Sequence, residues 1–176
     1  MTTFVCLLRA VNVGGTGKLP MADLSQLCVG AGFRKVQTYI ASGNVVLDSD
    51  AGELEVKARL EAALLKYAGK PIEVLVRSAA ALAAVLADNP FKQEAPNRCV
   101  AVFLDVQPTP DSLTHISGRH GEQLALGRRE IYIAYGAGIG QSKLKVPAAA
   151  MGTARNINTI TRLVQMAQMT SIAQGR

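Results

Sequence analysis

The residues of this chain that could do chemistry lie in segments rich in glycine and in hydrogen-bond donors. The first begins at Arg9, ends at Lys18 and contains three glycines. Glycine has no Cβ to hinder positive φ, so successive backbone N–H groups can turn toward one point between the two cations. This pattern predicts an anion receptor; the alternative is a long connection with a merely solvated lysine. The candidate contacts are Arg9, Asn12, Gly14, Gly15 and Lys18.

This first segment differs from a P-loop at three places. Asn12 stands where the first glycine belongs, Leu19 replaces the Ser or Thr that would hold magnesium, and Pro20 lacks an N–H donor. The segment is therefore not a Walker motif.

The second segment, Ser42-Gly43-Asn44, reads first as a tight turn, because Gly and Asn tolerate positive φ. In a ferredoxin-like order, however, the first two strands run parallel as a split βαβ unit, so the loops after them emerge at one end of the sheet. We therefore expect Asn44 to approach Asn12, and Ser42 and Asn44 are candidate ligand contacts.

Two further segments lie near the other end of the chain, at 138–145 and 153–159. In the first, glycines precede Ser142 and Lys143, which suggests a second phosphate nest; the alternative is a short helix that Ser142 caps. In the second, Arg155 and Asn156 are candidate contacts, although Asn156 would also serve as a helix N-cap.

No general base is evident in these segments, which contain no Asp, Glu, His or Cys. The sequence therefore assigns no catalytic residue and no cofactor. The three cysteines show no C-x-x-C pattern and no histidine at ligand spacing, so we expect buried, reduced thiols and no metal site. His115 and His120 are expected at the surface.

The charge of the chain is uneven. The net charge is +6, and Glu130 is the last acidic residue, so the positive excess lies toward the C-terminus. This asymmetry favours a phosphate-bearing or polyanionic partner, the alternative being a solvated basic face. Apolar runs are far shorter than the roughly 20 residues of a membrane span, and no basic signal-peptide start is present, so we expect a cytoplasmic protein without a membrane partner.

The hydrophobic patterns predict an α+β fold. The first half reads βαββαβ, which is ferredoxin-like, and a second, related α/β half shares its core. The predicted subdomains are 1–77, a helix and linker at 78–97, and 98–176. The predicted elements are strands 3–9, 35–40, 45–48, 72–77, 99–106, 122–126 and 130–135, and helices 20–30, 53–67, 79–86, 110–117 and 159–169.

The first strand of each half, Phe4–Leu8 and Val100–Leu104, is apolar on both faces. A lone ferredoxin-like sheet exposes one face to water. We therefore expect the second face of each sheet to be covered, by the other half or by a partner subunit.

The chain resembles the bacterial family called domain of unknown function 1697 over nearly its whole length. The resemblance implies a two-part α+β protein with a ferredoxin-like first half and implies no activity. Two positions depart from the family pattern: Ala10 where glycine is usual, and Ile157 where tryptophan is usual. The matching motifs are Arg9–Gly15, Lys18–Met21, Thr38–Val46, Asn89–Phe91, Gly140–Leu144 and Thr153–Asn156.

The sequence thus favours a binding protein for a phosphate-bearing ligand, either a nucleotide or a nucleic-acid backbone. One alternative is a phosphotransferase or phosphate-ester hydrolase whose acid or base, such as Asp23 or Asp48, comes from outside the motifs. A second alternative is a structural homo-oligomer whose glycine loops only pack. The first strand offers Phe4 as its single aromatic, so backbone or mononucleotide binding fits better than sequence-specific RNA recognition.

Overall fold

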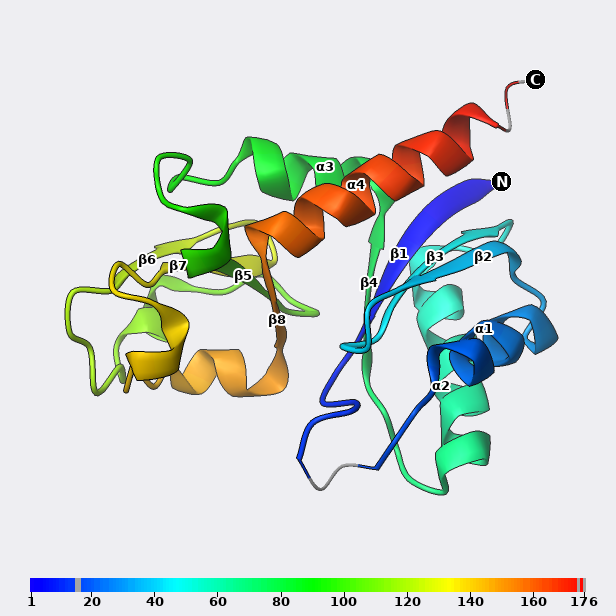
Figure 1. Ribbon diagram of the computed structural model, residues 1–176, viewed down its shortest axis with the longest axis horizontal. Coiled ribbons are helices and arrows are strands. Elements are labelled where there is room, and N and C mark those ends of the chain that lie inside the picture. Colours follow the sequence, from blue (N-terminus) through cyan, green and yellow to red (C-terminus); the bar gives the residue numbers. More distant parts are fainter. Residues whose placement is uncertain (15–16, 174, 176) are drawn as a thin grey trace. The chain divides into compact units, whose positions relative to one another are not determined.

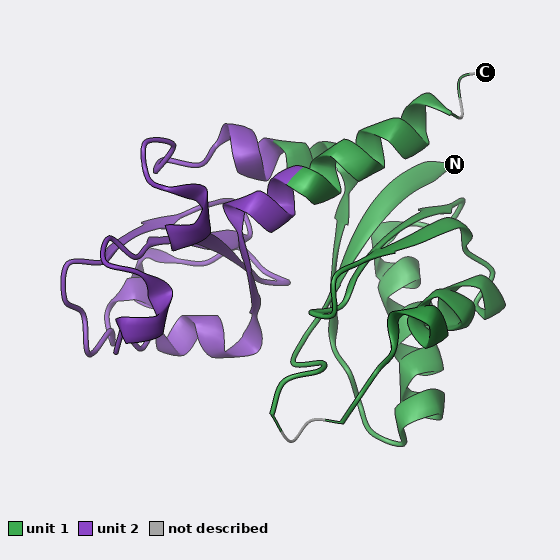
Figure 2. Cartoon of the chain, viewed as in Figure 1, with its two compact units in different colours: residues 1–83, 162–176 green, residues 84–161 purple. Residues whose placement is uncertain are grey.

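The computed structural model describes residues 1–14, 17–173 and 175. They form two four-stranded sheets in which every strand pair is antiparallel, together with α-helices. This arrangement confirms the predicted α+β class. Two compact units divide the chain, one formed by Met1–Ala83 with Arg162–Arg176 and the other by Ala84–Thr161 (Figure 2). The last helix thus begins in the second unit and ends in the first, whereas the sequence suggested continuous subdomains.

The first unit has the predicted ferredoxin-like order. Its sheet runs β2-β3-β1-β4, and α1 and α2 lie side by side on one face (Figure 1). The observed ends lie within two residues of the predicted ones. The elements are β1 (Thr2–Leu8), α1 (Met21–Gly30), β2 (Arg34–Tyr39), β3 (Asn44–Ser49), α2 (Glu53–Ala68) and β4 (Val74–Ser78).

The core of the first unit lies between this sheet and the two helices. Alternate β1 residues, Phe4, Cys6 and Leu8, point into it and pack with helix residues such as Leu24 and Leu60. Each of these side chains is at most 4% exposed. One face of β1 therefore packs against the helices of this core.

The opposite face of the first sheet is buried as well. Val5 and Leu7 on this face are 0% exposed. The end of α4 (Ile157–Ile172) reaches this face, where the Ser171 hydroxyl donates to Thr3 Oγ1 at 3.1 Å and Gln37 Nε2 donates to Thr170 Oγ1 at 3.3 Å. Residues of the chain's own last helix therefore contribute to the expected cover.

The second unit repeats the strand order without the helices. Its sheet runs β6-β7-β5-β8, which matches the first sheet strand for strand. Short 3-10 turns replace the two helices: η2 (Pro110–Leu113), η3 (Ile139–Gln141) and η4 (Pro147–Met151). The strands are β5 (Cys99–Phe103), β6 (Gln123–Leu126), β7 (Glu130–Ala134) and β8 (Thr153–Asn156), and α3 (Ala79–Ala87) and η1 (Pro96–Arg98) precede them.

Two predictions for the second unit were wrong. The expected helix at 110–117 is only a 3-10 turn, because the capping box of Thr109 and Ser112 starts a turn that Gly118, at φ +67°, cannot continue as a helix. Residues Thr153–Asn156, read as a loop or cap, form β8 at the edge of the sheet. Four residues are too short for a reliable alternating pattern.

The duplication extends to individual residues where each last strand meets its helix. Arg77 pairs with Val5 of β1, and Arg155 occupies the same register position opposite Ala101 of β5. The next residue caps the helix in both cases: the amide of Ala81 donates to Ser78 Oγ at 3.1 Å, and the amide of Thr159 donates to Asn156 Oδ1 at 2.9 Å. Both units therefore end in the same strand–cap–helix device.

None of the helices in the described residues combines the length and the apolar character that a membrane span requires.

Candidate functional site

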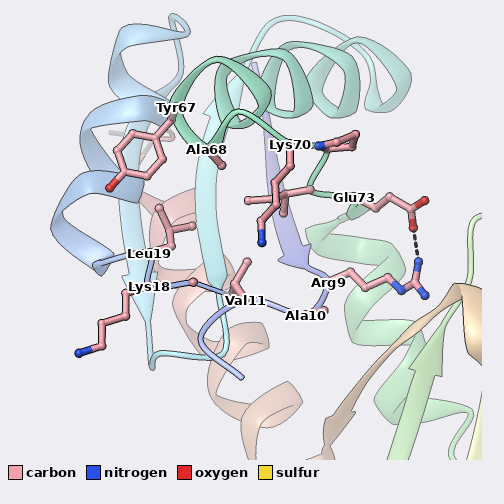
Figure 3. Close-up of a pocket in the computed structure, with 12 residues that line it drawn as sticks. Arg9, Ala10, Val11, Lys18, Leu19, Tyr67, Ala68, Lys70 and Glu73 are labelled. Carbon is pink, nitrogen blue, oxygen red and sulfur yellow. Dashed lines mark hydrogen bonds and ion pairs between the residues drawn. The ribbon is translucent and has the colours of Figure 1, made fainter. Parts of the chain in front are cut away.

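The best candidate site is a hollow of about 820 Å³ in the first unit. It lies where the loop after β1 meets the connection between α2 and β4 (Figure 3). Three cations line it, Arg9, Lys18 and Lys70, against the single carboxylate of Glu73. Apolar side chains, among them Leu19 and Ile72, form the rest of its wall. The hollow is therefore basic and partly apolar.

Arg9 is fixed at one side of this hollow by its neighbour strand. Its NH1 donates to Glu73 Oε2 at 2.7 Å, and its backbone amide donates to the Glu73 carbonyl at 2.9 Å. Both contacts exist because β1 and β4 are adjacent in the ferredoxin-like order. The same adjacency brings in Lys70, which sequence reasoning missed. The signal was available, since the loop before β4 must lie at the same end of the sheet as the loop after β1.

Asn12 holds the glycine-rich loop in place. Its Nδ2 donates to the carbonyls of Leu19 at 2.9 Å and Ala41 at 2.8 Å, and its Oδ1 accepts from the Leu19 amide at 2.7 Å. These bonds tie the loop after β1 to the loop after β2, as the parallel arrangement of the two strands predicted. The Asn12 side chain therefore positions the loop, and Lys18 extends from it (Figure 3).

Backbone strain is concentrated in these two loops. Ala10, Asn12 and Ile40 have φ values of +53°, +54° and +49°. A β-branched residue such as Ile40 rarely adopts this left-handed conformation, and each such residue costs about 1–3 kcal/mol. Glycine would adopt the φ of Ala10 without this cost, because it has no Cβ.

Ser42 and Asn44 close the turn between β2 and β3. Asn44 is 0% exposed, and its Nδ2 donates to the Tyr39 carbonyl at 2.8 Å and to Ser42 Oγ at 3.0 Å. These two candidate contacts thus serve the turn, the alternative that the sequence left open. Of the loop glycines, Gly14 is exposed, and Gly15 lies outside the described residues.

Ser142 and Lys143 line a different hollow, of about 610 Å³, in the second unit. Glu122 also lines it; this residue is 6% exposed and accepts hydrogen bonds from the Ser142 hydroxyl and the His120 amide. The bond from Ser142 is the main cause that lowers the pKa of Glu122 below its usual value. A carboxylate therefore sits where the sequence suggested a phosphate nest. Sequence reasoning missed it because Glu122 lies twenty residues before Ser142.

The remaining two candidate contacts are built into the second sheet. Arg155 is 7% exposed, and its NH1 donates to Thr153 Oγ1 at 2.7 Å and to the Ala154 carbonyl at 2.9 Å. Burial lowers the pKa of Arg155 to about 10. Asn156 is the helix cap described above.

The two acids named as potential bases have structural partners. The Tyr67 hydroxyl donates to Asp23 Oδ2 at 2.6 Å, and this bond is the main cause that raises the pKa of Tyr67. Asp48 is 0% exposed, accepts from Thr3 Oγ1 at 2.7 Å and lies 3.8 Å from the Lys35 ammonium.

The cysteines are buried free thiols, at positions 6, 28 and 99. Burial raises the pKa of all three, that of Cys28 to about 12. Within the described ranges, no group of three His, Cys, Asp or Glu side chains could hold a metal ion.

Comparison with known proteins supports the fold and adds no activity. The model of a family described as "Protein of unknown function (DUF1697)" matches residues 1–132. The conserved bacterial protein SP0830 from Streptococcus pneumoniae has a similar solved structure, with a TM-score of 0.78 and 25% sequence identity over 94% of this chain and 98% of that one. No curated protein matches this chain.

Proposed function

This chain belongs to the DUF1697 family, and we propose that it binds a phosphate-bearing ligand in the basic hollow of its first unit. The observation that carries the proposal is that Arg9, Lys18 and Lys70 line one hollow, in which Glu73 is the one carboxylate among the described lining residues. A phosphate monoester carries about −1.5 to −2 charges near pH 7 and so matches this excess of positive charge. The hollow of about 820 Å³ is also within the usual range of small-molecule sites, roughly 300–1,000 Å³.

The strained loop gives independent support. Folded proteins keep positive φ at non-glycine residues mainly where surrounding contacts enforce it, and such residues cluster at ligand sites. Here the Asn12 bonds to Leu19 and Ala41 enforce it. The strain is therefore consistent with a loop that is preorganised, so that little ordering is needed when an anion binds.

Fewer residues contact the ligand in this site than the sequence analysis suggested. Arg9 and Lys18 remain from the sequence analysis, Lys70 is added, and Asn12 becomes a positioning residue. Ser142 and Lys143 lie in a hollow that also holds the Glu122 carboxylate, and the Ser142 hydroxyl already donates to that carboxylate.

Titration calorimetry of the full chain with inorganic pyrophosphate tests the proposal. The double variant Lys18→Met with Lys70→Met should bind at least tenfold more weakly, because it removes two charge-assisted contacts. Lys92→Met, at an exposed lysine of the second unit, is the matched control and should bind as the wild type does. Equal binding by all three proteins would contradict the proposal. Absence of pyrophosphate binding by the wild type would favour the structural homo-oligomer.

A phosphotransferase or hydrolase remains the alternative function, since phosphoryl transfer depends mostly on positioning and electrostatics. The engagement of Asp23 with Tyr67 and of Asp48 with Thr3 and Lys35 argues against either acid as its base. Hydrolysis or transfer of a nucleotide phosphate by the purified chain in the presence of magnesium would favour the enzyme over the binding protein.

We also propose a location in the bacterial cytoplasm, a reducing compartment that suits three buried free thiols.

A further inference from the structure

The basic hollow is chemically different at its two sides. The Arg9–Glu73 ion pair lies at one side, and the ring of Tyr67 lies at the other, near Leu19 (Figure 3). Lys70 points into the space between them (Figure 3). A simple phosphate would need only the cations. A ligand with a second, flat group could also contact the aromatic and apolar side.

Tyr67 is suited to carry such a group. The residue is 44% exposed, so its ring is accessible, and the bond from its hydroxyl to Asp23 Oδ2 holds the ring between α1 and α2. A fixed aromatic ring stacks on a nucleobase with little loss of side-chain freedom. Pro71 and Ile72 add apolar surface to the wall of the same hollow.

The end of α2 adds hydrogen-bond acceptors beside this ring. Tyr67 and Ala68 form the last turn of the helix, whose final carbonyls have no intrahelical donor. Pro71, four residues after Tyr67, has no N–H that could satisfy the Tyr67 carbonyl. The C-terminal end of a helix also carries partial negative charge, which disfavours a phosphate and favours an amino group.

We infer that the ligand is a nucleotide whose base carries an exocyclic amino group, of the adenine type. The base stacks on Tyr67 and donates to the carbonyls at the end of α2, and the phosphate lies among Arg9, Lys18 and Lys70. This inference rests on the proposed function, because the phosphate must occupy the same cations.

Calorimetry of the full chain with three probes tests the inference: adenosine 5′-monophosphate, inosine 5′-monophosphate and inorganic phosphate. Inosine monophosphate keeps the phosphate and the ring system but lacks the amino group. We expect the adenine nucleotide to bind at least tenfold more tightly than each of the other probes. Tyr67→Leu should weaken its binding about tenfold and leave inorganic phosphate unaffected. Tyr67→Phe keeps the ring and should stay within about threefold of the wild type, and melting curves check that both variants fold.

Each other outcome has a definite meaning. If inorganic phosphate binds as tightly as the nucleotide, or if Tyr67→Leu weakens both equally, the inference is wrong and the proposed function stands. Equal affinity for the two nucleotides overturns the role of the helix carbonyls. Tighter binding of a short oligonucleotide than of the mononucleotide overturns the inference in favour of a nucleic-acid backbone. If no probe binds, the proposed function fails as well.

Discussion

The two units of this protein share a strand order but differ in the connections between their strands. After β1, a long loop with strained residues leads into α1 and lines a basic hollow. After β5, the chain passes through Asp105 to a 3-10 turn, and the Glu122 carboxylate is among the groups that line the hollow of the second unit. A shared sheet therefore does not imply a shared ligand, because the connections supply the charges. On this basis we assign the proposed anion site to the first unit.

The first sheet contacts α4, a helix that begins in the second unit, and removal of α4 should have the largest effect. In a chain that ends at Thr161, the first unit loses Leu163 and Ala167, which are 0% exposed, and the contacts of Thr170 and Ser171. One buried Leu alone contributes about 1.5–3 kcal/mol, within a total stability of about 5–15 kcal/mol. We expect urea unfolding, followed by circular dichroism, to lose its cooperative transition.

A chain that ends at Ala173 serves as the control and should unfold as the full chain does. An unchanged urea midpoint for the chain that ends at Thr161 would show that the first sheet does not need α4.

Substitution of one glycine in each unit is the next test of the difference between the two units. At Gly43, with φ +85°, a Cβ would lie 2.6 Å from Val11 Cγ2 and 2.9 Å from Leu8 Cβ, and at Gly118, with φ +67°, it would collide with the Lys143 carbonyl. Gly43→Ala and Gly118→Ala should each lower the free energy of unfolding by about 3 kcal/mol. Only Gly43→Ala should also weaken pyrophosphate binding, since it separates the loops that carry the basic hollow. Loss of binding in both variants would mean that the second unit shares the site.

Substitution of Asn12 tests whether binding depends on the fixed conformation of the loop after β1. Asn12→Ala removes three hydrogen bonds and should destabilise the protein by about 1–3 kcal/mol. Because the loop then loses its fixed conformation, pyrophosphate affinity should fall about tenfold although no charge is removed. Asn97→Ala, at an exposed position of η1, should change neither quantity. Unchanged affinity in Asn12→Ala would leave the loop geometry without a role in binding.

Relief of strain in the same loop should act in the opposite direction. Ala10→Gly removes the Cβ at φ +53° and should raise the free energy of unfolding by about 0.5–1 kcal/mol. The same change at an exposed position inside a helix, Ala62→Gly in α2, should lower the free energy of unfolding by about 0.5–1 kcal/mol. Thermal melts of the two variants measure whether each substitution raises or lowers the stability. Destabilisation by Ala10→Gly would show that the left-handed backbone at this position is unstrained.

The smallest effect concerns Glu122, which lines the hollow of the second unit. Ser142→Ala removes the main bond that lowers the pKa of Glu122, so the pKa should rise toward its usual value of 4.5. A carboxyl whose folded pKa is depressed stabilises the fold above its unfolded pKa and loses this contribution as the pH falls through the folded pKa. The variant should therefore lose less stability than the wild type between pH 5 and roughly pH 3. A carboxyl titration by NMR measures the pKa directly, and an unchanged value would contradict the assigned cause.

Much of the fold could be predicted because its signals are local. The short apolar run Phe4–Leu8 and the helical spacing of Leu60 and Leu64 specify their elements within a few residues. The short polar strand Thr153–Asn156 gave no such signal, since its pairing with β5 depends on a partner fifty residues away. The candidate site was predicted in part for the same reason. Arg9 and Lys18 belong to one local motif, whereas Lys70 joins them only through the sheet.

The sequence by itself determined most of the strands and helices and where the glycine-rich, donor-bearing loops lie, because these properties depend on neighbours within a few positions. Only the tertiary structure decided the role of each donor. Asn12, Asn44 and Asn156 have the same side chain, yet one ties two loops, one closes a turn and one caps a helix. The physical reason is that an amide bonds to whatever polar group the packed chain places within about 3 Å of it. Those groups come from distant parts of the sequence, and their positions are fixed by the burial of the apolar residues between them.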